Sequence, residues 1–257
     1  MRFASTFLKG ISIACLMGAT LAAQPATAAE FTDAQKAEII ETVRTFLLEN
    51  PELLQEMIAA MELKEQAALA EMASRGITDN AKILFRSEAD AVLGNPEGDV
   101  TVVEFFDYNC GYCKRAHPDV AALLERDKNV RFVYKEFPIL GPGSLVASKA
   151  AIASKKQGKY ESFHNAMMEH GSPLDEDAVF AIAQEQGLDI EKLKQDMEAP
   201  EVKAQIEQSY RLAQALGING TPAYVVGNRL VPGALGVDRI AETVNEVRAA
   251  GACKNLC

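Results

Sequence analysis

Apolar residues recur with helical spacing in two segments near the start of the chain. Thr32 and Gln35 have the spacing of a capping box, and the apolar positions that follow share one helix face. Asn50-Pro51 is expected to end this helix and start a second, because proline is well tolerated in a first helical turn. The second helix is expected to end near Gly76. The apolar stripes of these helices must pack on the rest of the protein or on further copies of the chain.

Strands and helices alternate from about Ala89 onward. The nearly continuous apolar run at 100–106 predicts a buried central strand. A helix is predicted at 110–125, and an alternating pattern at 130–134 predicts a second strand. A strand, a helix and another strand form a βαβ unit, so we expect a parallel strand pair and an α/β fold.

The rest of the chain is helical first and then contains a hairpin. Helical spacing continues from Ser144 to about Gly217, strands follow at 223–226 and 229–231, and a last helix is predicted at about 237–249. The chain thus divides into a leader, a helical segment, a linker and a domain with a helical insertion at about 144–217. These four parts are residues 1–29, 30–76, 77–88 and 89–257.

The leader has the features of a cleaved signal peptide. A basic start precedes an apolar run from Gly10 to Ala23, and small residues follow that run. The run is shorter than the roughly 20 apolar residues that cross a bilayer. We therefore expect an exported, periplasmic protein, and we expect the mature chain to be soluble.

Export changes the interpretation of the cysteines. Once Cys15 is removed with the leader, two close pairs remain, which are Cys110 with Cys113 and Cys253 with Cys257. An exported chain can keep disulfides, so the C-terminal pair is expected to form one, provided that the last helix ends before it. The alternatives are two free thiols in a frayed tail, or a structural zinc site made by all four sulfurs.

The pair Cys110 and Cys113 is the strongest candidate for chemistry. A CxxC motif that follows a buried strand and opens a helix places its first cysteine at the helix N-terminus, where free N–H groups stabilise a thiolate. The second cysteine lies one turn inside and can resolve a mixed disulfide. The net charge of −10 argues against a nucleic-acid partner. We expect no cofactor and no bound metal.

Three features together resemble the DsbA-like branch of the thioredoxin superfamily: the run 104–113, the helical stretch after Ser144, and the run 220–223. Proteins of this branch insert a helical domain into the thioredoxin fold, and a cis-proline loop faces their dithiol. The resemblance therefore implies that Pro222 is that cis-proline and that Thr221 precedes it.

The resemblance also implies roles for single residues. Cys110 becomes the nucleophile and Cys113 the resolving thiol. Glu104 is implied to lie beneath the dithiol, where burial would raise its pKa and let it shuttle the proton of the resolving thiol. The alternative is an edge-strand residue facing solvent. Lys135 resembles the lysine that partners buried acids in this branch, whereas His117 is expected on the helix surface.

The N-terminal helices make the chain similar to the suppressor-of-copper-sensitivity C proteins. Residues 31–75 match their oligomerisation segment in kind, which implies a homo-oligomer, most simply a trimer. Gly111-Tyr112 offers no side chain that stabilises the thiolate as Pro-His does in strong oxidants, and Thr221 resembles isomerases. We therefore expect a disulfide isomerase or reductase that acts on misfolded exported proteins and is reset by a membrane thiol reductase or oxidase. The alternatives are a thiol oxidase and a copper- or zinc-binding thiol protein.

Overall fold

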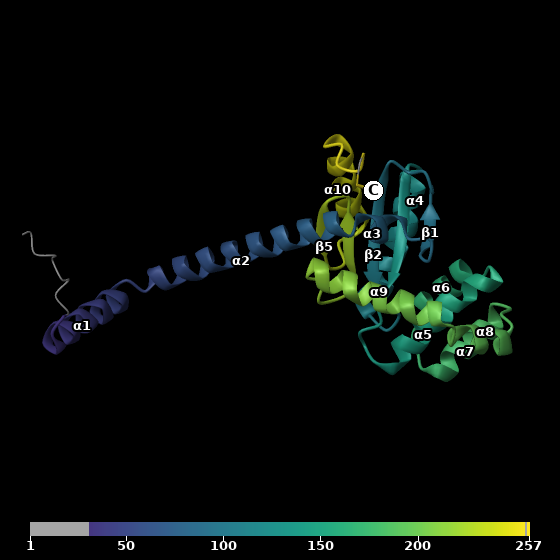
Figure 1. Ribbon diagram of the computed structural model, residues 1–257, viewed down its shortest axis with the longest axis horizontal. Coiled ribbons are helices and arrows are strands. Elements are labelled where there is room, and N and C mark those ends of the chain that lie inside the picture. Colours follow the sequence, from purple (N-terminus) through teal and green to yellow (C-terminus); the bar gives the residue numbers. More distant parts are fainter. Residues whose placement is uncertain (1–30, 255) are drawn as a thin grey trace, which may run out of the picture. The chain divides into compact units, whose positions relative to one another are not determined.

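The computed structural model describes residues 31–254 and 256–257 (Figure 1). Its chain divides into two compact units after Ile58. The predicted signal peptide lies outside the described residues. None of the helices in the described part is both long and apolar enough to cross a membrane.

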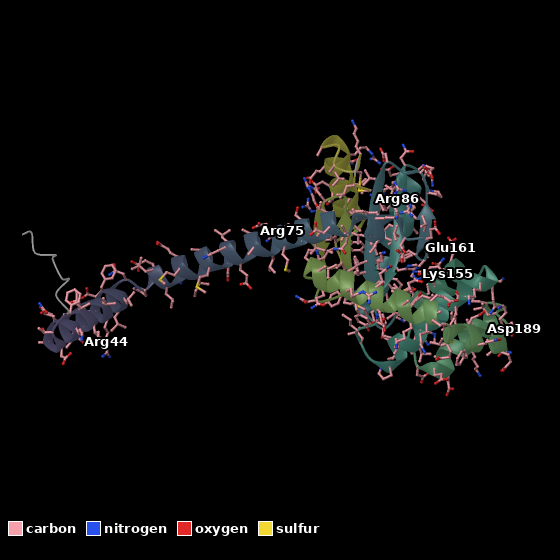
Figure 2. All side chains as sticks on the ribbon, in the orientation of Figure 1. Arg44, Arg75, Arg86, Lys155, Glu161 and Asp189 are labelled. Carbon is pink, nitrogen blue, oxygen red and sulfur yellow. A yellow bond between two sulfur atoms is a disulfide. The ribbon has the colours of Figure 1, made fainter. Side chains whose placement is uncertain are left out.

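The first unit contains α1 (Asp33–Glu49) and the beginning of α2 (Glu52–Asp79). The predicted capping box is confirmed: the Thr32 hydroxyl accepts from the Gln35 backbone N–H at 3.3 Å, and the Gln35 side chain accepts from the Thr32 N–H at 2.9 Å. Asn50 caps the end of α1, as predicted. No residue of α1 is buried within the described part of the chain, where its side chains are drawn in Figure 2.

The predicted end of the second helix near Gly76 is wrong, because α2 continues to Asp79. A Cβ atom at Gly76 would collide with the backbone of Ala215 in α9 (Pro200–Leu216). The glycine therefore serves close helix packing and does not end the helix. Residues 77–88, predicted as a linker, are mostly helical, with α3 at Ala81–Arg86.

One mixed five-stranded sheet forms the centre of the second unit, with the strand order β1-β3-β2-β4-β5. The strands are β1 (Ala91–Gly94), β2 (Val100–Phe106), β3 (Val130–Glu136), β4 (Ala223–Val226) and β5 (Arg229–Pro232). The predicted parallel pairing of β2 with β3 is confirmed, and the other neighbours are antiparallel. The sequence analysis did not predict β1.

The helical stretch and the last helix are found where they were predicted. The remaining helices are α4 (Gly111–Arg126), α5 (Pro142–Ser154), the 3₁₀ turn η1 (Lys155–Gln157), α6 (Tyr160–Glu169), α7 (Glu176–Glu185), α8 (Ile190–Met197) and α10 (Val237–Ala249). Helices α5 to α9 form the insertion between β3 and β4, and this placement positions the loop before β4 against the start of α4.

The two faces of the sheet carry separate hydrophobic clusters. Successive side chains of a strand point to opposite faces, so Val102 and Phe106 share one cluster with Cys113, while Val103 and Phe105 belong to the other. The first face packs against α4, α5, α6 and α10, and the second against α3 and α9. Every residue of β2 and β3 is buried, although the sequence of the second strand alternates between apolar and polar residues.

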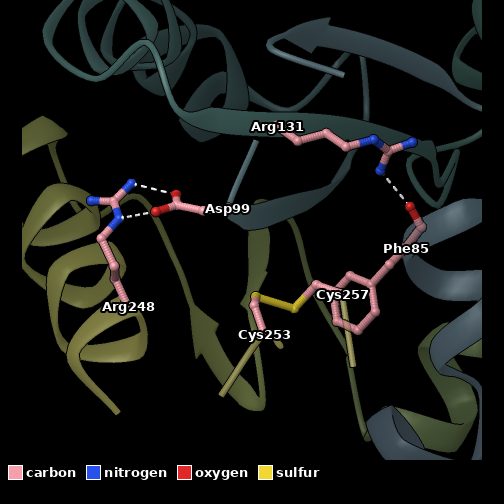
Figure 3. The surroundings of a disulfide bond; sticks show 6 residues. All are labelled: Phe85, Asp99, Arg131, Arg248, Cys253 and Cys257. Carbon is pink, nitrogen blue, oxygen red and sulfur yellow. Dashed lines mark hydrogen bonds and ion pairs between the residues drawn. A yellow bond between two sulfur atoms is a disulfide. The ribbon is translucent and has the colours of Figure 1, made fainter. Parts of the chain in front are cut away.

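The C-terminal cysteines form the expected disulfide. Helix α10 ends at Ala249, and Gly251 adopts a left-handed φ of 62°, so the chain turns back before Cys253. Cys253 and Cys257 are joined with their Cα atoms 4.7 Å apart (Figure 3). This bond occupies two of the four sulfurs that the alternative zinc site requires.

Candidate active site

Cys110 is the N-cap residue of α4, directly after the loop that leaves β2. Its thiol is largely buried, yet its pKa is lowered to about 5, chiefly by a hydrogen bond from the Cys113 thiol. Backbone N–H groups of Tyr112 and Cys113 stabilise the thiolate further, whereas burial opposes ionisation. These are the free donors of a first helical turn. Cys110 is therefore a thiolate at neutral pH.

Cys113 has the opposite character. It is fully buried on the sheet side of α4. Burial raises its pKa strongly, and the hydrogen bond with Cys110 and the nearby charge of Glu104 raise it further. The motif thus contains one ionised thiol at the helix end and one protonated thiol beneath it.

The loop between α9 and β4 lies against the dithiol. The peptide bond between Thr221 and Pro222 is cis. The sulfur of Cys110 lies 3.2 Å from the carbonyl oxygen of Thr221, a contact that joins residues 111 positions apart in the chain. The structure therefore brings together the two motifs that the sequence analysis paired.

Glu104 lies in the middle of β2, between β3 and β4, and only 1% of it is exposed. The alternative of an edge-strand residue facing solvent is therefore wrong. Burial raises its pKa to about 8, although the hydroxyl of Tyr224, which donates to its carboxylate at 3.2 Å, acts in the opposite direction. A carboxyl group with this pKa gains or loses its proton near neutral pH, close to the protonated thiol of Cys113.

Lys135 does not partner Glu104. It lies opposite Phe105 in the register of β2 and β3, so its side chain leaves the other face of the sheet. There it forms a fully buried ion pair with Asp90 and donates to the carbonyl oxygen of Ile83 at 2.8 Å. The pair fixes α3 and the start of β1 to the sheet and is separated from the dithiol.

Sequence analysis did not single out Asp107, which organises the loop before Cys110. Its buried carboxylate accepts from the backbone N–H groups of Asn109, Ile139 and Leu140 and from the hydroxyl of Ser144, at 2.7 to 2.9 Å. The loop is thereby attached to the start of the helical insertion. An Asp two residues before Asn109 is the pattern of an Asx turn, which was the available sequence signal.

The histidines lie closer to the core than expected. His164 is fully buried, and its Nδ1 is 2.9 Å from the hydroxyl of Tyr108. The ring of His117 packs on it with centroids 5.3 Å apart, and His117 is half-buried, so it is less exposed than a helix-surface position implies. Within the described residues, no group of three or more His, Cys, Asp or Glu side chains could hold a metal ion.

Two family models match the chain. The model of the DSBA-like thioredoxin domain matches residues 101–245. That of the copper resistance protein ScsC N-terminal domain matches residues 35–68. The first match contains the dithiol and the cis-proline loop, and the second contains most of the N-terminal helices.

Solved structures with the same fold include a thioredoxin-like oxidoreductase from Silicibacter pomeroyi. It is 54% identical, with a TM-score of 0.65 over 65% of this chain and 97% of that chain. The Proteus mirabilis ScsC in a transitional conformation is 27% identical, with a TM-score of 0.63 over 87% of this chain and 100% of that chain. The second similarity therefore reaches into the N-terminal segment.

Curated relatives include the probable disulfide bond formation protein D of Bacillus cereus. It is 28% identical, and the match covers 60% of this chain and 78% of the relative. The Na(+)/H(+) antiporter NhaA 3 of Salinispora tropica is 29% identical over 67% of this chain. The chain spans about a quarter of the length of this antiporter, namely 26%.

Proposed function

We propose a function from the premise that this chain belongs to the DsbA-like thioredoxin-domain family: it is a thiol–disulfide oxidoreductase whose reactive pair is Cys110 and Cys113. The observation that carries the proposal is the opposite shift of the two thiol pKa values. Cys110 is ionised and lies at a helix end, so it can attack, while Cys113 stays protonated and shielded until it is needed.

The reaction follows from this asymmetry. The Cys110 thiolate attacks a substrate disulfide, forms a bond to one substrate sulfur and releases the other as a thiolate. Cys113 then loses its proton and attacks the Cys110 sulfur, which closes the protein disulfide and frees the substrate thiol. Glu104 takes up that proton, because its pKa of about 8 is close to the working pH. In isomerisation, a different substrate thiolate attacks the substrate sulfur of the mixed disulfide instead, which forms a new substrate disulfide and releases the Cys110 thiolate.

Two matched substitutions test this assignment. The variant Cys113→Ala keeps the nucleophile but cannot resolve, so it should accumulate mixed disulfides with a substrate of scrambled disulfides. The variant Cys110→Ala removes the nucleophile and should accumulate none. Mass spectrometry of the acid-quenched mixture distinguishes them, and equal trapping by both variants would contradict the assignment.

The finer proposal is a disulfide isomerase or reductase that works as a homotrimer on misfolded periplasmic proteins. It is supported by the match to the ScsC N-terminal domain and by large apolar side chains that the single chain leaves exposed. In the first unit these are Ile39, Ile40, Val43, Phe46, Leu47, Leu48, Leu54, Met57 and Ile58. Burial against sister chains removes that apolar surface from water, and several dithiols near one captive substrate raise the effective thiolate concentration.

A charge placed on this apolar surface tests the oligomer. Phe46→Glu should convert the full mature chain from trimer to monomer in light scattering, because a carboxylate cannot be buried unpaired between helices. Arg44→Glu is the matched control, since Arg44 lies on the same helix and the substitution removes no large apolar side chain. A wild-type monomer would refute the oligomer. The monomeric variant should also rearrange scrambled disulfides more slowly while its dithiol stays reactive.

One observation favours the second candidate, a thiol oxidase. A Cys110 pKa of about 5 means that the reduced form is stabilised, and a stabilised reduced form makes the disulfide a stronger oxidant. Equilibration with reduced and oxidised glutathione, followed by quantification of both protein forms, distinguishes the candidates. A strongly oxidising equilibrium would favour the oxidase, with a membrane oxidase as the resetting partner in place of a reductase.

A further inference from the structure

A groove of about 840 Å³ begins at the loop before β4, whose residue Thr221 contacts the Cys110 sulfur. One side is the loop that contains Thr221 and Pro222, and a second side is β5 with Gly233. The third side is the C-terminal half of α2, which contributes Gln66, Leu69, Ala70, Ala73 and Ser74. A DsbA-like domain without this helix would lack that third wall.

The wall from α2 is held in place by close packing. The terminal methyl group of Met72 lies where a Cβ of Gly217 would be, so the glycine at the end of α9 makes room for α2. One turn later Gly76 lies against the backbone of Ala215. Ala73 is 3% exposed at the base of the wall. These contacts fix the face that α2 turns toward the groove.

Leu69 is the large apolar side chain that α2 offers to an occupant. It lines the groove, yet 49% of it remains exposed. The groove is open along Gly220 and Gly233, because a Cβ added at either position would meet no atom within 4 Å. An exposed leucine facing open space gains free energy when another apolar side chain covers it.

The place where the groove starts identifies its occupant. Thr221 lines the groove, and its carbonyl oxygen holds the Cys110 sulfur at 3.2 Å. Any polypeptide bonded to that sulfur therefore has the groove directly beside its cysteine. The two arginines that line the groove are already paired, Arg239 with Glu242 at 2.6 Å and Arg229 with Glu246. The guanidinium groups of both arginines are therefore already engaged, and Leu69 is the large apolar contact that the α2 side of the groove offers.

We propose that Leu69 is a specificity-determining residue, so that α2 selects extended substrate segments with a large apolar side chain close to the reacting cysteine. The proposal rests on the proposed function, since it requires a mixed disulfide at Cys110. It gives α2 a role beyond oligomerisation: Leu69 directly follows the segment, 35–68, that the ScsC N-terminal model matches.

The test is an equilibrium in which only the groove differs. The full mature chain carrying Cys113→Ala is prepared with Cys110 bonded to glutathione and is then mixed with a short peptide thiol. The bond between Cys110 and glutathione breaks, a bond between Cys110 and the peptide forms, and the peptide proton ends on glutathione. Two peptides are compared, identical except for a leucine or an aspartate beside the cysteine. Mass spectrometry gives each equilibrium constant.

The parent should prefer the leucine peptide, and Leu69→Glu should lower that preference about tenfold, which is the usual effect of one apolar contact in a specificity pocket. Leu69→Lys should shift the preference toward the aspartate peptide. Leu63→Glu is the matched control, because Leu63 lies on α2, is 68% exposed and does not line the groove. Its preference should equal that of the parent.

Each outcome is decisive. An unchanged preference in both Leu69 variants overturns the inference and leaves the proposed function intact. A loss of preference in Leu63→Glu equal to that in Leu69→Glu also overturns it, because the effect would then come from α2 as a whole. Failure of the parent to form any mixed disulfide refutes the proposed function, and the inference with it.

Discussion

Replacing Glu104 by glutamine should give a protein whose stability exceeds that of the wild type by a margin that grows as the pH rises. The same substitution should slow closure of the Cys110–Cys113 disulfide. The substitution keeps the size of the side chain and the acceptor for the Tyr224 hydroxyl. It replaces the carboxyl group, which ionises, by an amide, which does not. Glu104 has a pKa of about 8 in the folded protein, against an ordinary value of 4.5, because burial disfavours its charge.

The sign follows from proton linkage. Below about pH 4.5 the carboxyl group is protonated in both folded and unfolded chains and contributes no difference. Between about pH 4.5 and 8 it ionises only on unfolding, so the unfolded state binds fewer protons and the wild type loses stability as the pH rises. At 1.36 kcal/mol per pKa unit the full effect is roughly 5 kcal/mol, reached near pH 8. Glutamine does not lose this stability.

The assay is urea unfolding of both proteins, with the dithiol reduced, from about pH 4.5 to 9. The advantage of Glu104→Gln over the wild type, taken relative to low pH, should grow and then level off near pH 8. An advantage that does not change with pH would refute the reasoning. Closure of the Cys110–Cys113 disulfide should slow about 100-fold, the lower range for loss of a general base.

Glu136→Gln is the matched control for the kinetic effect. Glu136 is equally buried, and burial raises its pKa to about 8 as well. Its carboxylate accepts from the hydroxyls of Tyr108 and Tyr160 at 3.2 and 2.9 Å, which the glutamine oxygen can still do. It should show the same pH-dependent stabilisation but leave closure of the dithiol unchanged.

Three further predictions concern other parts of the chain. The thiolate absorbance of the reduced protein should rise with a midpoint at about pH 5 and vanish in Cys110→Ser, whereas a midpoint above about pH 8 would contradict the site geometry. Lys135→Met should lower the free energy of unfolding by about 3–5 kcal/mol, because it leaves Asp90 buried without its ion-pair partner. Adding Asp90→Leu should restore most of the lost stability in urea unfolding, whereas additive losses would contradict the pairing. Cys253→Ser should lower the free energy of unfolding by about 2 kcal/mol in urea unfolding. The reactivity of the dithiol should stay the same, and loss of mixed-disulfide trapping would contradict the independence of the two cysteine pairs.

The reactive pair could be predicted from the sequence because its signals are local. A CxxC motif between an apolar strand and a helix places its first cysteine at the helix end, where a thiolate is stabilised. The signals of the C-terminal disulfide are local as well, since the chain turns at Gly251, between the end of α10 and Cys253. Pairing the dithiol with Thr221 required the family resemblance, because no local pattern connects residues 111 positions apart.

Other features could not be predicted because they depend on tertiary packing. Gly76 has the local signature of a helix end, but its close packing against α9 decides its conformation. Lys135 pairs with Asp90 because its side chain lies on the sheet face opposite that of Glu104. The sequence does not reveal that face, because β2 and β3 are buried on both sides and the apolar pattern therefore does not distinguish the two faces. At β1, four residues are too few to show a strand period.

The separation of Cys110 from Thr221 has a consequence for newly made chains. Synthesis starts at the N-terminus, so both cysteines of the motif exist before the loop at Thr221 and strand β4 have been made. Until β4 pairs with β2, Cys110 has neither the carbonyl contact nor the groove beside it. A nascent chain therefore carries both cysteines of the motif before it carries the loop and the strand that complete their surroundings.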